Sequence, residues 1–138
     1  MSRIIQLNGS GKQRELLVRS IVLALRELAA RNEVSDETRD LAAYISLALH
    51  SISQSIDPTV EAWEKRGYWL KADRFRLEWA WTGEVAIEMR AAALKGDWER
   101  AAGLCAKIAQ RLDGVTLPKR NRLGTPWVGA WERLSSLS

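Results

Sequence analysis

"WEKRGYWLKADRFRLEWAW", residues 63–81, contains four of the chain's seven tryptophans and five of its lysine and arginine residues. On a helical wheel this stretch forms two apolar stripes on nearly opposite sides of one helix. A helix that is apolar on two sides must be covered on two sides, so we expect it to run through the middle of a bundle. One stripe consists of Tyr68, Ala72, Phe75 and Trp79, and the other of Trp63, Leu70, Leu77 and Trp81.

Apolar residues also recur at helical spacing before and after this stretch. They predict helices over about 12–31, 36–55 and 97–113. The quoted stretch belongs to a helical segment over about 58–95, in which Gly67 and Gly83 are the candidate interruptions. No strand pattern of any strength follows residue 7. The sequence therefore predicts an all-α fold, a four-helix bundle-like single domain with a long central third helix.

Polar residues and glycines mark the ends of these predicted helices. Ser35 or Asp36 suits the N-cap of the second helix, and Asp57 suits that of the third. Gly96 is placed to end the third helix in the left-handed conformation, and Asp97 then caps the fourth.

The chain divides into a helical bundle, residues 1–114, and a tail, residues 115–138. The tail is basic and rich in glycine and proline, which favours an extended segment with a short helical turn at its end. Trp127 and Trp131 lie in this tail, and exposed indole rings would make it prone to association. We therefore expect the tail to dock on the bundle.

Composition indicates a protein of the cytoplasm. No apolar run reaches the roughly 18 residues that a membrane span requires. The apolar patch near the N-terminus is too short for the core of a signal peptide. The single cysteine, Cys105, excludes an internal disulfide and agrees with a reducing compartment. We expect no membrane partner.

The residues that most enzymes use are scarce. One histidine, His50, and one cysteine cannot supply the ligand set of a zinc site. Gly11 begins a Gly-Lys pair, but Gln6 and Gln13 stand where a phosphate-binding loop needs glycine and a hydroxyl. We expect no enzymatic activity, no metal and no cofactor.

Positive charge is concentrated in the second half of the chain. Residues 1–62 contain 7 basic and 8 acidic side chains, whereas residues 63–138 contain 14 basic and 9 acidic ones. Such an asymmetry favours a polyanionic partner, so the leading hypothesis is a subunit that binds the nucleic-acid backbone, DNA or RNA, with weak sequence specificity. An ordinary solvated surface with scattered ion pairs is the competing explanation.

Trp69 is the aromatic residue most suited to contact a base, because it belongs to neither apolar stripe. Lys65 can pair with Glu61 and Arg74 with Glu78, each one turn away, which leaves Arg66, Lys71 and Arg76 less obviously paired. The predicted nucleic-acid-binding residues are Arg66, Trp69, Lys71, Arg74, Arg76, Lys119, Arg120 and Arg122.

The alternative hypothesis is a protein-interaction or oligomerisation adaptor, most simply a two-fold dimer. It applies if the bundle leaves one stripe of the third helix uncovered. The predicted contacts are Trp63, Leu70, Leu77, Trp81, Trp127 and Trp131.

Overall fold

The computed structural model describes the backbone of residues 2–137 and the side chains of residues 11–137. This part of the chain is all-helical and contains no strand, which confirms the predicted fold class. None of its helices is both long and apolar enough to cross a membrane. The helices are α1 (Ser2–Ala29), α2 (Asp36–Gln54), α3 (Ile56–Lys65), α4 (Trp69–Trp79), α5 (Trp81–Lys95), α6 (Trp98–Arg111) and α7 (Ala130–Ser136).

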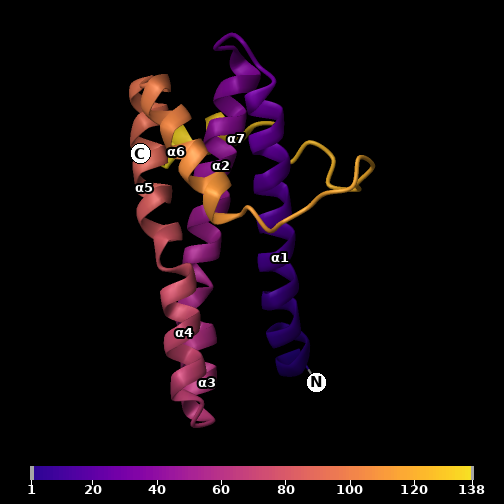
Figure 1. The fold of residues 1–138 in the computed structure, drawn as a ribbon, viewed down its shortest axis with the longest axis vertical. Coiled ribbons are helices and arrows are strands. Elements are labelled where there is room, and N and C mark those ends of the chain that lie inside the picture. Colours follow the sequence, from indigo (N-terminus) through magenta and orange to yellow (C-terminus); the bar gives the residue numbers. More distant parts are fainter. Residues whose placement is uncertain (1, 138) are drawn as a thin grey trace.

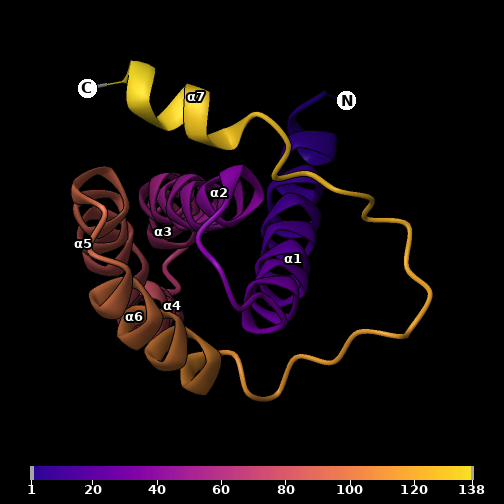
Figure 2. The same cartoon turned by 90° about the horizontal axis from the view of Figure 1, so that it is seen from above.

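Helix α2 is the centre of the fold. Helices α1, α5 and α7 pack against it from different sides, and α6 packs against α5 (Figures 1 and 2). Leu41, Ile45 and Leu49 of α2 are fully buried, and alanines between them allow close approach of the neighbouring helices. The Ser46 hydroxyl donates to the carbonyl of Ala86 at 2.9 Å, which joins α2 to α5.

The prediction of one long central helix over 58–95 was wrong. Gly67, with φ of +80°, reverses the chain between α3 and α4. The amide of Tyr68 donates to the carbonyl of Trp63 at 2.9 Å and closes the end of α3. At Ala80 the backbone keeps helical dihedral angles, so α4 passes into α5 almost directly. The segment is therefore a helical hairpin followed by a core helix.

The reversal at Gly67 explains how the two apolar stripes are covered. Residues of α3 and α4 form a small cluster of their own, separate from the main core, in which Ile56, Val60 and Phe75 are buried. The hairpin thus covers one stripe of α4 with α3. Leu70 and Leu77 of the other stripe are 65% and 78% exposed. The bundle does not cover that second stripe along α4.

Three of the predicted helix ends are confirmed. The Ser35 side chain accepts from the backbone N–H of Thr38 at 3.3 Å and caps α2. The Asp97 side chain accepts from the N–H of Arg100 at 3.2 Å and caps α6. Gly96 ends α5 with φ of +72°.

Two of the predicted helix starts were wrong. Helix α1 begins at Ser2 and passes through Gly11, whereas we predicted that the first helix begins at about residue 12. One glycine inside a helix costs only about 1 kcal/mol, so it does not enforce a break. Helix α3 begins at Ile56, so Asp57 lies inside it instead of capping it.

Residues 112–129 connect α6 to α7 without a helix. This connection passes beside α1 and leads to α7, which lies against α2 (Figures 1 and 2). Trp127 belongs to the main core and is 4% exposed. The carboxylate of Asp40 on α2 accepts from the N–H groups of Gly129 at 3.2 Å and Trp131 at 2.8 Å. These bonds fix the start of α7.

Candidate nucleic-acid interface

The α3–α4 hairpin is stabilised by aromatic packing between its two helices. Trp63 of α3 meets Phe75 of α4 edge-on, with ring centres 5.0 Å apart and an angle of 79°. Trp79 also packs against Phe75, with ring centres 6.3 Å apart. Such aromatic pairs add directional packing to the burial of their area. The hairpin, which we call the arm, forms one end of the molecule (Figure 1).

The tip of this arm exposes a large aromatic surface. Tyr68, Trp69 and Leu70 follow Gly67 directly and are 52%, 62% and 65% exposed. Trp69 has no ring partner within the part of the chain whose side chains are described. An indole at the N-terminal end of α4 is therefore free to stack on a planar group from outside.

Lys71 and Arg74 line one groove with the exposed indole, and the carboxylate of Glu78 lines it too. Arg66 and Arg74 are exposed, and neither forms an ion pair with any described residue. The predicted pairing of Arg74 with Glu78 is thus wrong. The ammonium of Lys71 lies 4.7 Å from the centre of the Trp63 ring, a cation–π contact that leaves its charge uncompensated.

Arg76 differs from its neighbours, because it is neutralised. Its guanidinium pairs with Glu64 at 3.5 Å and with Asp73 at 3.1 Å. We predicted Arg76 as one of the less obviously paired cations, and this was wrong, since Glu64 reaches it across the hairpin. Arg76 is therefore the weakest of the predicted phosphate contacts.

The basic residues of the tail lie away from the arm. Lys119, Arg120 and Arg122 are all exposed and belong to the connection between α6 and α7. Figure 1 shows this connection beside the middle of α1, whereas the hairpin forms one end of the molecule. The predicted residues therefore form two groups, which we call the tip cluster (Arg66, Trp69, Lys71, Arg74) and the loop cluster (Lys119, Arg120, Arg122).

Sequence reasoning missed the cations of α1. Lys12 is exposed and Arg19 is half-buried, and Arg19 lines a shallow groove together with Val115 and Thr116 of the connection. Figure 2 shows α1 between the hairpin and the outward part of the connection. The charge totals did not reveal these residues, because carboxylates in residues 1–62 offset their positive charge in the sum.

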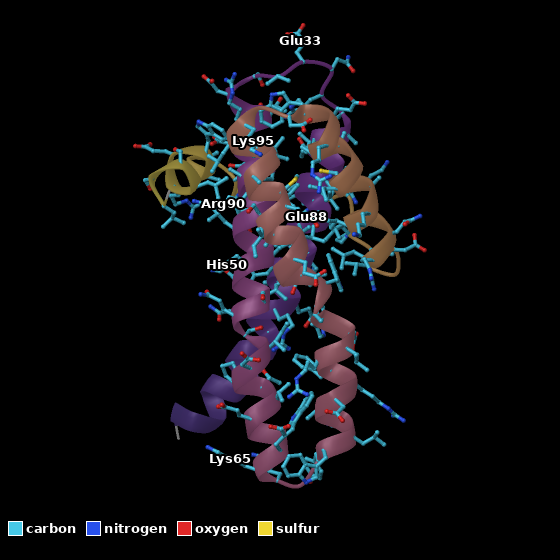
Figure 3. All side chains as sticks on the ribbon, turned by 90° about the vertical axis from the view of Figure 1, so that its left-hand side faces the viewer. Glu33, His50, Lys65, Glu88, Arg90 and Lys95 are labelled. Carbon is cyan, nitrogen blue, oxygen red and sulfur yellow. The ribbon has the colours of Figure 1, made fainter. Side chains whose placement is uncertain are left out.

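Some of those carboxylates lie at the opposite end of the molecule from the tip cluster (Figure 3). Figure 3 places Glu33 at one end and Lys65, beside the turn of the hairpin, at the other. Two further carboxylates, Asp36 and Glu37, open α2 near Glu33. Other carboxylates of residues 1–62 are part of the hairpin itself, because Asp57 and Glu61 belong to α3.

Arg14 connects α1 to the arm. Its guanidinium lies 4.6 Å from the centre of the Phe75 ring and donates to the Ser55 hydroxyl at 3.3 Å and the Thr59 hydroxyl at 3.0 Å. Burial lowers the pKa of Arg14, and the carboxylate of Glu78 offsets part of that effect. No sequence signal marked this residue, because its partners are 41 to 61 positions away.

The residues predicted for a protein interface have unequal exposure. Trp127 is buried, Trp131 is half-buried, and Trp63 and Trp81 pack against the two apolar clusters. The guanidinium of Arg111 lies 5.7 Å from the centre of the Trp81 ring. The exposed members of this set are Leu70 and Leu77.

Few side chains in the described part of the chain have an environment typical of a catalytic group. Burial raises the pKa of Cys105 to about 12, which keeps its thiol protonated at neutral pH and slow to react. Among residues 11–137, no group of three or more metal-ligating side chains comes together. His50 is exposed on α2 (Figure 3).

A scan against protein-family models finds no match, and comparisons with curated proteins and with solved structures find no similar chain. Function must therefore be inferred from the geometry of this chain.

Proposed function

We propose that the protein is a non-enzymatic subunit that binds the backbone of nucleic acid, preferring single strands. The observation that carries this proposal is an exposed indole, Trp69, in a groove at the tip of the hairpin that Lys71 and Arg74 also line, neither of them in an ion pair with any described residue. Phosphate groups attract the cations, and an unstacked base can lie on the ring. A base inside a duplex could not reach Trp69, which is why a single strand is the expected partner.

Binding through the two clusters predicts a specific dependence on salt. Each phosphate neutralised on a single strand contributes about 0.7 to the slope of log affinity against log salt. Changing Arg66 and Arg74 to glutamine should lower that slope by roughly 1 to 1.5 units, if each contacts one phosphate. Changing Lys119, Arg120 and Arg122 together should lower it by roughly 2 units.

Arg76 supplies a matched control on the same helix. Its charge is already compensated by Glu64 and Asp73, so Arg76→Gln should leave the slope nearly unchanged. Trp69→Ala should weaken binding roughly tenfold without changing the slope, because stacking on the ring depends little on salt. The measurement is fluorescence anisotropy of labelled oligothymidylate at several salt concentrations. No binding at low salt, or equal effects of Arg74→Gln and Arg76→Gln, would contradict the proposal.

A protein-interaction adaptor is the second candidate, and one observation favours it. Leu70 and Leu77 are seven positions apart, so they lie on one face of α4, and both are largely exposed. Two copies could cover this stripe on each other in a two-fold dimer. Sedimentation at several concentrations would then show a dimer that Leu77→Glu abolishes. A chain that stays monomeric at every concentration would exclude the homodimer.

A further inference from the structure

A cleft of about 470 Å³ lies between α1 and α6, far from the hairpin. The residues that join α1 to α2 border one end of it, the end that Glu33 marks in Figure 3. Leu25 and Leu28 of α1 form one wall, and Trp98 and Cys105 of α6 belong to the other.

Small side chains on α6 create this space. Ala102, Ala106 and Ala109 lie along the side of α6 that lines the cleft, and all three are exposed. The volume of the cleft falls within the roughly 300–1,000 Å³ of sites that bind small molecules.

Charges at the rim of the cleft restrict what it can bind. Arg31 is the one cation among the residues that line it, and its guanidinium pairs with Glu37 and, at 3.5 Å, with Glu27. Glu33 also lines the rim. Three carboxylates around one guanidinium leave an excess of negative charge, which disfavours an anionic ligand.

We propose that this cleft binds a compact hydrophobic molecule without negative charge. Its apolar body would lie between the leucines of α1 and the alanines of α6, and any polar group would face Glu33 at the rim. Burial keeps the Cys105 thiol neutral, so the wall adds no charge that an apolar ligand would have to compensate.

Two probes with the same ring system test whether the cleft disfavours a negatively charged ligand. N-phenyl-1-naphthylamine is neutral, and 8-anilino-1-naphthalenesulfonate adds one sulfonate to it. Cys105 is the chain's only cysteine, so its alkylation by N-ethylmaleimide reports on this cleft alone. The neutral probe should slow alkylation at least about fivefold at saturation, whereas the sulfonate should need roughly tenfold higher concentration. No protection by the neutral probe, or equal protection by both, overturns the proposal.

Filling the cleft gives an independent test. Ala106→Phe should abolish binding of the neutral probe, measured by its fluorescence, and Ala102→Leu should weaken it. Gln110→Phe places the same ring on α6 outside the cleft and should leave binding unchanged. Circular dichroism establishes that each variant is folded. Binding that survives both cleft substitutions, or that Gln110→Phe removes equally, also overturns the proposal. The nucleic-acid measurements are independent of these, because the tip and loop clusters contribute no residue to the cleft.

Discussion

The guanidinium of Arg14 lies over the ring of Phe75, 4.6 Å from its centre, and joins the longest helix to the arm. The same group donates to hydroxyls of Ser55 and Thr59, so one side chain contacts α4, the end of α2 and the start of α3. The main core and the hairpin cluster are separate apolar clusters. Arg14 therefore adds a polar link between the two clusters to the apolar one that Trp79 makes by packing against both.

Replacing Arg14 with methionine should loosen the arm. The change keeps apolar bulk but removes the cation–π contact and two hydrogen bonds, which together stabilise the fold by about 2 kcal/mol. Urea unfolding should show that loss, and amides of residues 56–79 should exchange faster. Lys12→Met, at an exposed position of the same helix, should have little effect. Equal stability of the two variants would show that Arg14 does not hold the arm.

Replacing Asp40 with asparagine should weaken the attachment of α7. The carboxylate accepts two backbone N–H groups at the start of that helix, and the amide can accept with one oxygen only. The expected loss is about 1 kcal/mol in urea unfolding. Asp113→Asn, an exposed position in the connection, is the control. An unchanged free energy of unfolding in Asp40→Asn would mean that packing of Trp127 alone fixes the tail.

The same substitution should have opposite effects at two glycines. Gly67 has φ of +80°, so Gly67→Ala should destabilise by about 1 kcal/mol even though no atom lies within 4 Å of the added methyl. Gly103 lies inside α6 with similar open space and no positive φ, so Gly103→Ala should stabilise by roughly 0.5–1 kcal/mol. Thermal unfolding measures both. Destabilisation by both changes would contradict this expectation, because it would show that the methyl group added at Gly103 clashes with neighbouring atoms.

Stability should fall at alkaline pH in a way that depends on Cys105. Its pKa is raised from 9.0 to about 12 by burial, so above pH 9 the unfolded thiol loses its proton while the folded one keeps it. The unfolded state then binds fewer protons, and stability decreases as pH rises. Between about pH 8 and pH 10, wild type should lose about 1 kcal/mol more than Cys105→Ala. A difference that does not change with pH would show that the folded thiol ionises normally.

Short-range patterns in the sequence determined the helices and several of their ends. Apolar spacing predicted the all-helical class, and Ser35, Asp97 and Gly96 act at the positions where local chemistry places them. Each of these features depends on residues within one turn of one another, so the chain encodes it locally. The exposed Trp69 was predicted on the same basis, because the periodicity of α4 assigned it to neither stripe.

Tertiary structure alone decided where the chain reverses and which charges come together. Gly67 can sit inside a helix or end it, and the choice depends on whether α3 or a distant helix covers the apolar stripe of α4. The periodicity of apolar residues shows which face of a helix is apolar, but it does not show which helix packs on that face. Pairs such as Arg14 with Phe75 and Asp40 with Trp131 join positions 61 and 91 residues apart, and the neutralisation of Arg76 by Glu64 crosses the hairpin. Such contacts exist only once the chain has folded, because no local rule relates residues so far apart in sequence.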